Sequence, residues 1–156
     1  MENDYFARNL VKGKIAETIF AQMFREVGEF TVIEFGYEKI IPELVQQKGK
    51  NRLIIETLRT APDFAVIDLK FKKVKLIEVK YKHISNPKYI LEDAVRMSRS
   101  WNPSYLFVAT LTGFYFDSIN TIIKNKGEIS QLKHSQITGK VQARYLKILQ
   151  DFENKK

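Results

Sequence analysis

Two acidic residues and a lysine lie at a spacing that suits phosphate chemistry. Asp63 follows Pro62, and after a further fourteen residues come Glu78, Val79 and Lys80. Carboxylate oxygens are ligands that Mg²⁺ and Mn²⁺ prefer, and such an ion lowers the pKa of a bound water. A nearby ammonium group helps to orient that water or to stabilise a phosphate. These residue types predict metal-dependent hydrolysis of a phosphodiester.

The segments that carry these residues are predicted to pair as a hairpin. Residues 63–69 and 74–82 are rich in apolar and β-branched residues, with a basic turn between them. A symmetric turn would place Asp63 opposite Lys80 and on the same face as Glu78. A one-residue slip in register would move Asp63 to the other face.

Both faces of this predicted hairpin are otherwise apolar, so we expect both to be covered. One face carries Ile67, Leu69, Val74 and Leu76, and the other carries Phe64, Val66, Ile77, Val79 and Tyr81. Two carboxylates and an ammonium group at the end of such a core strand are costly unless something compensates their charge. A bound divalent cation would do so.

The remaining segments predict an α/β fold with a mixed central sheet, as one domain over residues 1–156. Helices are expected at 4–27, from Asn86-Pro87 onward, at Asp117 to Asn125 and at 139–152, with strands at 30–35 and 105–110. Residues 53–58 fit a short strand or a helix end. The first helix should bury Val11, Ile15, Ile19, Met23 and Val27, and the last should bury Val141, Tyr145, Ile148, Leu149 and Phe152.

Composition favours a polyanionic partner. The net charge is +8 and the pI is about 9.6, which favours nucleic acid first and an anionic membrane second, although many lysine-rich proteins are simply soluble. No cysteine is present and only two histidines are, which disfavours disulfides and zinc sites. The sequence shows neither a signal peptide nor a membrane span, so we expect an intracellular protein.

The pattern Pro62-Asp63, fourteen residues, then Glu78-Val79-Lys80 resembles the motif of the PD-(D/E)XK nuclease superfamily. The predicted order, αβββαβ over roughly residues 8–110, is similar to the restriction-endonuclease-like core of that family. The resemblance implies a DNA endonuclease that uses Mg²⁺ or Mn²⁺. It implies Asp63 and Glu78 as metal ligands and Lys80 as the third catalytic residue.

A segment of the first helix, residues 13–17, resembles the Holliday-junction resolvase branch of that superfamily. The resemblance implies Glu17 as a further catalytic residue and metal ligand, and Glu17 falls at the edge of the helix's apolar face. The RecB-type branch places a Gln on the helix after the Glu-x-Lys strand, and this sequence has none there. Arg96 and Arg99 on that helix fit phosphate contacts or, for Arg96, a pair with Glu92.

Each candidate residue also has a plain structural explanation. Asp63 fits a turn after proline, Glu78 and Lys80 fit an exposed charge ladder, and Glu17 fits a solvated helix border. Glu34 and Glu38 are candidate extra ligands or ordinary surface charges. Lys82 fits a phosphate contact or, as we expect, a strand end at the surface, and His83 fits a DNA contact or an ordinary loop position. The basic residues gather in sequence around the proposed site: Lys48, Lys50, Arg52, Lys70, Lys72, Lys73, Lys75, Lys82 and Lys88.

Three overall interpretations therefore remain. The first is a homodimeric endonuclease, since cutting a duplex or a junction needs two symmetric sites. The second keeps the fold without catalysis, as a nucleic-acid-binding module or a subunit activated by a partner. The third is a basic scaffold protein, which predicts that Glu78 is exposed and that no metal binds. The sequence does not choose among junction, restriction, repair and mobile-element roles, or between DNA and RNA.

Overall fold

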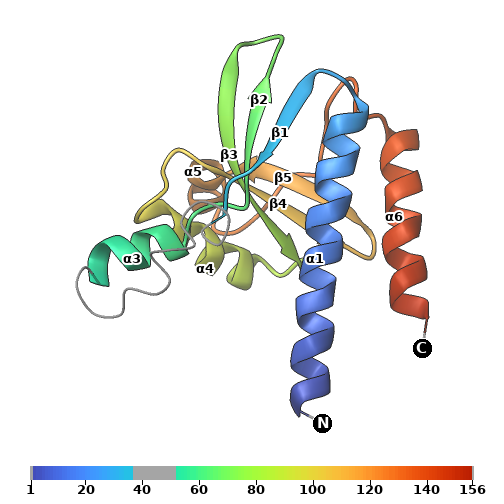
Figure 1. The fold of residues 1–156 in the computed structure, drawn as a ribbon, viewed down its shortest axis with the longest axis horizontal. Coiled ribbons are helices and arrows are strands. Elements are labelled where there is room, and N and C mark those ends of the chain that lie inside the picture. The colour runs from blue at the N-terminus through green and yellow to red at the C-terminus, as the bar shows by residue number, and fades with distance from the viewer. Residues whose placement is uncertain (1, 37–51, 156) are drawn as a thin grey trace.

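A five-stranded mixed sheet with the strand order β1-β2-β3-β4-β5 lies at the centre of the computed structural model, which describes residues 2–36 and 52–155 (Figure 1). Only β3 and β4 run parallel, and the helix α4 connects them. The elements are α1 (Glu2–Glu26), β1 (Phe30–Glu34), α3 (Arg52–Arg59), β2 (Phe64–Asp68), β3 (Lys73–Tyr81), α4 (Pro87–Ser98), β4 (Tyr105–Thr110), β5 (Gly113–Ser118), α5 (Ile119–Lys124) and α6 (Gly139–Asn154). The predicted α/β class is confirmed.

The predicted element order needs two corrections. A helix, α3, lies between β1 and β2, which settles the segment that fitted either a strand or a helix end. A further strand, β5, follows β4, so Asp117 lies in a strand instead of starting a helix. Its carboxylate accepts the N–H of Ser130 at 2.7 Å. The cap of α5 is Ser118, whose hydroxyl accepts the N–H of Thr121 at 3.1 Å.

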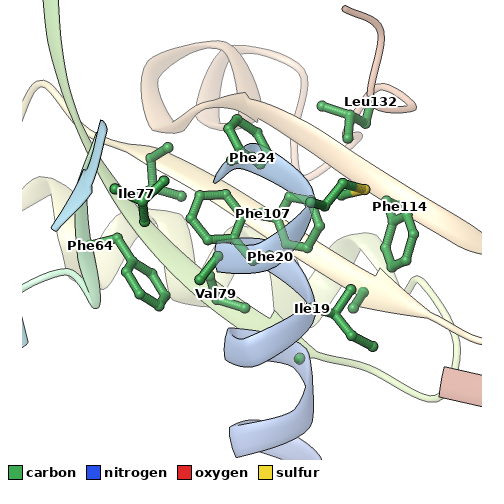
Figure 2. Packing of buried hydrophobic residues seen from close by; sticks show 14 of the residues in the cluster. Ile19, Phe20, Phe24, Phe64, Ile77, Val79, Phe107, Phe114 and Leu132 are labelled. Carbon is green, nitrogen blue, oxygen red and sulfur yellow. The ribbon is translucent and has the colours of Figure 1, made fainter. Parts of the chain in front are cut away.

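Helices cover the two faces of the sheet and bury a separate apolar cluster on each. On one face, α1 packs against β1, β3 and α6 around an aromatic core (Figure 2). The ring of Phe20 lies 5.0 Å from that of Phe107 and 5.1 Å from that of Phe64. On the other face, α4 and α5 bury the second cluster: Ile90, Ala94, Met97, Leu106, Val108, Ile119 and Ile122. This layering fixes the positions of α1 and α4 on opposite sides of β3.

Only part of each terminal helix is buried as the periodicity predicted. The apolar face of the second half of α1 is buried, but Val11 in its first half is 45% exposed, because that half extends beyond the sheet (Figure 1). In α6, Leu149 is fully buried, whereas Ile148 and Phe152 are 50% and 36% exposed. An apolar stripe continues past the point where a packing partner ends, which the periodicity alone does not reveal.

The β2–β3 hairpin has a register two residues away from the predicted one. Ile67 pairs with Val74, and Ala65 pairs with Leu76. The turn contains residues 69–72 because the buried carboxylate of Asp68 accepts the N–H groups of Lys70 and Phe71 there. The tip is also uncovered, which the apolar pattern predicted wrongly, since Leu69 and Val74 are 55% and 64% exposed.

The structure also bears on the membrane question. None of the helices within residues 2–36 and 52–155 is both long and apolar enough to span a lipid bilayer.

Candidate active site

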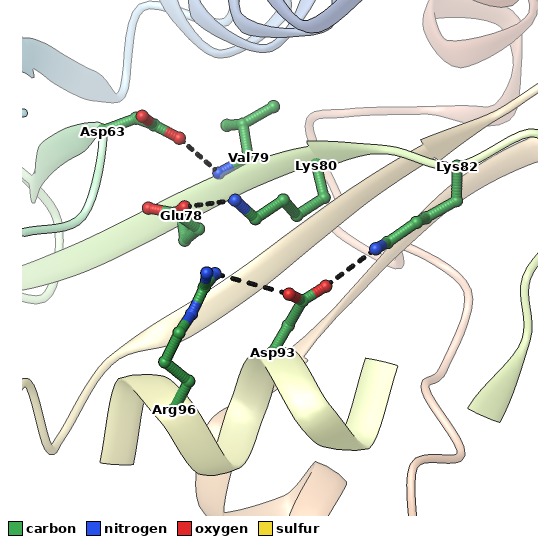
Figure 3. Close-up of polar contacts among 7 residues, drawn as sticks. All are labelled: Asp63, Glu78, Val79, Lys80, Lys82, Asp93 and Arg96. Atoms are coloured by element: carbon green, nitrogen blue, oxygen red, sulfur yellow. Dashed lines mark hydrogen bonds and ion pairs between the residues drawn. The ribbon is translucent and has the colours of Figure 1, made fainter. Parts of the chain in front are cut away.

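The candidate site lies where β2 separates from β3. Their pairing ends at Phe64 and Ile77, but β3 continues to Tyr81. Beyond Ile77, β2 no longer pairs with this edge of β3. There the Oδ2 of Asp63, just outside β2, accepts the N–H of Val79 at 2.8 Å (Figure 3). The predicted pairing of Asp63 with Lys80 is therefore wrong. The open edge of β3 leaves room for groups from both faces of the sheet.

Asp63 is held from two sides. Its backbone carbonyl accepts the N–H of Phe35 at 2.8 Å and of Gly36 at 3.2 Å, both at the end of β1. Its carboxylate binds the backbone of β3. The residue thus bridges two strands, through its backbone carbonyl and its carboxylate, and does not merely close a local turn. Its second oxygen is available for another interaction at the same edge.

Glu78 and Lys80 lie on the same face of β3, as expected from strand geometry. The Lys80 Nζ lies 2.7 Å from Glu78 Oε1, and the two side chains are 28% and 12% exposed (Figure 3). The scaffold interpretation expected an exposed Glu78, which is wrong. A short, largely buried ion pair of this kind requires compensating interactions.

The surroundings of Asp63 shift its ionisation. Burial, and then the negative charge of Glu78, raise the pKa of Asp63 to about 7, against the opposing hydrogen bond from Val79. The charge of Glu17 acts in the same direction as that of Glu78. Near neutral pH the carboxyl group is therefore partly protonated, and a cation placed beside it would favour the ionised form.

Lys80 remains a cation in this environment. Burial alone would lower the pKa of Lys80, but the charge of Glu78 and the hydrogen bond to it outweigh burial, so the pKa lies above its usual value. Such an ammonium group donates hydrogen bonds and positive charge, and it does not abstract a proton near neutral pH.

Glu17 reaches the same place from α1. A cleft of about 680 Å³ and a smaller one of about 270 Å³ are both lined by Glu17, Asp63 and Glu78. Glu17 is 27% exposed and pairs with Lys14 at 3.1 Å. The structure thus brings together all four residues that the sequence indicated: Glu17, Asp63, Glu78 and Lys80. Glu34 lines the larger cleft as well.

The larger cleft is also lined by cationic residues that the sequence motifs did not indicate. They are Lys14 and Arg25 from α1 and Arg59 from α3. Arg25 donates to the carbonyl of Val32 at 3.2 Å, which holds it near β1. The spacing of Lys14, Glu17 and Arg25 on one helix was a usable signal, but the position of Arg59 depends on how α3 packs.

A second charged group extends the site along β3. Asp93 on α4 pairs with Lys82 at 2.9 Å and with Arg96 at 3.4 Å (Figure 3). The sequence suggested Glu92 as the partner of Arg96, but the partner in the structure is Asp93. Lys82 is 26% exposed and so is only partly a surface residue. Its ammonium group faces α4, where it contacts the carboxylate of Asp93.

Among the described residues, the other candidates do not line either of these two clefts. His83 and Arg99 are exposed, and His134 packs its ring 5.1 Å from that of Phe30. Glu38, Lys48 and Lys50 lie outside the described residues, as does the side chain of Arg52.

The donor set suits a hard cation held by few protein ligands. Over the described part of the chain, no group of three or more His, Asp and Glu side chains is placed to hold a metal ion together. Asp63 and Glu78 instead offer two carboxylates beside a cleft, and Mg²⁺ is often held by one or two carboxylates, with water and substrate phosphate completing its shell. The residues present therefore fit such an ion, and the role of Glu17 as a ligand stays a prediction.

A further cleft of about 660 Å³ lies elsewhere, between β5 and α6. Its lining includes Gln131, His134 and Gln142, and no carboxylate from the described residues. It offers no comparable arrangement of charged groups.

Comparison with known proteins does not assign this chain to a family. No family model matches it, and no curated protein matches it. The α/β fold with its five-stranded mixed sheet, and the grouped side chains at the edge of β3, are therefore the basis for any statement about function.

Proposed function

We propose that this chain is a metal-dependent endonuclease that hydrolyses phosphodiester bonds in DNA, built on a restriction-endonuclease-like core. One observation carries the proposal: Asp63, Glu78 and Lys80 meet at the open edge of β3, in a cleft that Glu17 also lines. Structural charge ladders lie on exposed strand edges, whereas Glu78 is only 12% exposed here.

Asp63 and Glu78 would hold Mg²⁺ or Mn²⁺, with Glu17 as a further ligand. When bound, such an ion supplies a water of lowered pKa and positive charge for the phosphate. Asp63 is fixed for this role, since its backbone and one carboxylate oxygen are already bound to β1 and β3. The raised pKa of Asp63 also fits a site that binds an additional cation.

Lys80 would act as a fixed cation. Its ammonium group lies 2.7 Å from Glu78 and would orient the attacking water or stabilise the charge that develops on the phosphate. Lys14, Arg25 and Arg59 line the larger cleft and would bind the phosphates beside the scissile one. A duplex needs both strands cut, so we propose a homodimer, for which the exposed apolar first half of α1 offers a contact surface.

Cleavage assays test the proposal directly. Plasmid, linear, single-stranded and four-way-junction DNA would be incubated with Mg²⁺ or Mn²⁺, for the wild type and for Glu78→Gln. We expect the substitution to reduce the rate at least about 100-fold and EDTA to abolish cleavage. Glu128→Gln, which changes an exposed acid after α5, is the matched control and should cut like the wild type.

Two results would contradict the proposal. One is cleavage that persists in EDTA, and the other is cleavage that survives Glu78→Gln unchanged. If the wild type cuts nothing yet binds DNA in a salt-dependent way, the chain is a binding module or needs an activating partner. Calorimetric titration with Mn²⁺ would then show whether the carboxylates still bind a metal.

A further inference from the structure

The tip of the β2–β3 hairpin is an exposed apolar and basic segment that is connected to the site. We define the hairpin tip as residues 69–74, and all six of its side chains are exposed. Leu69, Phe71 and Val74 are 55%, 62% and 64% exposed. The hairpin projects past the helices that cover the rest of the sheet (Figure 1). Exposed apolar side chains gathered in this way mark an interaction surface.

The hairpin tip has a defined conformation. Asp68 is only 7% exposed, and its Oδ1 accepts the N–H groups of Lys70 and Phe71, each at 3.0 Å. The N–H of Leu69 donates to the carbonyl of Glu29 at 3.0 Å, which ties the turn to the start of β1. These hydrogen bonds therefore hold the backbone that carries the exposed side chains.

Lys72 has a conformation that favours glycine. Its φ is +52°, in the left-handed region that residues with a Cβ adopt at a cost. Its side chain is exposed and makes no ion pair or hydrogen bond with the described residues. Glycine at this position would make the folded protein more stable, so the presence of lysine points to a role other than stabilising the fold.

The chemistry of the hairpin tip fits a nucleic acid. Lys70, Lys72 and Lys73 surround Phe71, and the Lys70 ammonium group lies 5.5 Å from the Phe71 ring. Asp68, the acidic residue that precedes this turn, is buried, and its carboxylate accepts backbone N–H groups of the turn. Lysines bind backbone phosphates, and exposed Phe or Leu side chains wedge against bases in proteins that bend DNA.

The position of the hairpin tip relates it to the proposed site, because β3 carries both. Glu78 lies six positions after Lys72, which is roughly 20 Å at about 3.3 Å per residue. The same length of duplex holds about six base pairs at about 3.4 Å each. We propose that the hairpin tip contacts duplex DNA about six base pairs from the scissile phosphate, with its lysines on the backbone and Phe71 against the bases. The stated spacing rests on the proposed function of the site, whereas the DNA contact does not.

Binding measured without cleavage tests the contact. Fluorescence anisotropy of a labelled 30-base-pair duplex in EDTA, at several KCl concentrations, would compare the wild type with Lys72→Gly plus Lys73→Gln and with Phe71→Ser. Lys72→Gly relaxes the backbone, so weaker binding by the lysine variant cannot be assigned to misfolding. Controls on α6, Lys147→Gln and Ile148→Ser, remove an exposed lysine and an exposed apolar side chain far from the hairpin.

We expect the lysine variant to bind at least about 10-fold more weakly, with a salt slope smaller by about 2. Phe71→Ser should weaken binding about 5-fold or more, the loss of a base contact, at an unchanged slope. Hairpin-tip variants that bind DNA like the α6 controls would overturn the inference. So would loss of binding to phosphatidylserine vesicles without loss of DNA binding, since the partner would then be a membrane.

The outcomes also separate this inference from the proposed function. If the protein cuts no DNA but its DNA binding depends on the hairpin tip, the contact is supported and only the nuclease proposal fails. Cleavage that depends on Glu78, together with DNA binding that ignores the hairpin tip, overturns the contact and supports the nuclease.

Discussion

Asp63 combines a structural and a chemical role in one side chain. It replaces a missing strand at Val79 and also faces the carboxylate of Glu78. Burial and that neighbouring charge raise the pKa of Asp63 to about 7. A carboxyl group buried in this way favours the protonated state in the folded protein, and the stability of the metal-free protein must therefore depend on pH.

The sign of this dependence follows from the direction of the shift. Between about pH 4 and 7 the folded state holds a proton that the unfolded chain releases, so stability falls as pH rises through this range. Asp63→Asn removes the titration while keeping an oxygen that can accept the Val79 N–H. We expect Asn to be more stable than Asp at pH 8 by up to a few kcal/mol, and the difference to shrink at pH 5. Urea unfolding in EDTA at both pH values measures this, and parallel profiles would contradict it.

At the residue scale, the sequence indicated which residue types form the candidate site, but not which residues each of them contacts. The spacing of Glu78 and Lys80 predicted that their side chains share a face, because alternation along a strand is fixed by geometry. Asp63 joins them through the hydrogen bond from the Val79 N–H and not through the predicted pairing with Lys80. The link between Asp93 and Lys82 was not predicted. It depends on how α4 lies across β3, and a helix rotation of one residue would present a different side chain.

At the element scale, hydrogen bonding in turns and packing between elements determine strand register and helix position, which the hydrophobic periodicity does not predict. Asp68 sets the turn and thereby moves the predicted register of β2 against β3 by two residues. An even shift keeps each side chain on its face, which is why Glu78 and Lys80 still point as expected. Helix α4 begins where predicted, with Asn86 as the cap and Pro87 at its first turn.

The position of α4 depends on a glycine after α5. Gly127 has a φ of +95°, and a Cβ there would lie 2.0 Å from the carbonyl oxygen of Pro87. Gly127→Ala must push α4 away or distort the turn, so we expect a loss of at least about 2 kcal/mol in unfolding free energy. Gly139→Ala is the matched control, since a Cβ there has nothing within 4 Å.

The control should be neutral or stabilising by up to about 1 kcal/mol, as usual for Gly to Ala in a helix. Urea unfolding followed by circular dichroism compares the two variants. Equal stabilities would show that α4 does not need this close contact.

At the scale of the whole molecule, the layering of helices on the sheet determines where the charged side chains of the site meet. Helices on both faces leave the end of β3 as the place where α1 and α4 both contribute side chains. The sequence predicted the α/β class and most elements from their periods. It missed β5 and the exposed first half of α1, because neither depends on the local pattern alone: each reflects which surfaces find a partner.

The net charge of +8 predicts how DNA binding responds to salt. If four to six phosphates are neutralised, the logarithm of the affinity falls against the logarithm of salt with a slope of about −4 to −5. Between 50 and 200 mM salt, affinity should drop about 250- to 1,000-fold. Anisotropy titrations of the wild type measure the slope, and a flat response would exclude backbone phosphates as the main contact.

The hydrogen bond from Val79 to Asp63 has a spectroscopic consequence. A backbone amide that donates to a titrating carboxylate, and not to a carbonyl, changes its environment whenever that carboxylate gains or loses charge. In a ¹H–¹⁵N correlation spectrum, the Val79 resonance is thus a built-in reporter of the charge at the candidate site. A single peak can follow protonation and the arrival of a cation, without substrate and without any label beyond nitrogen.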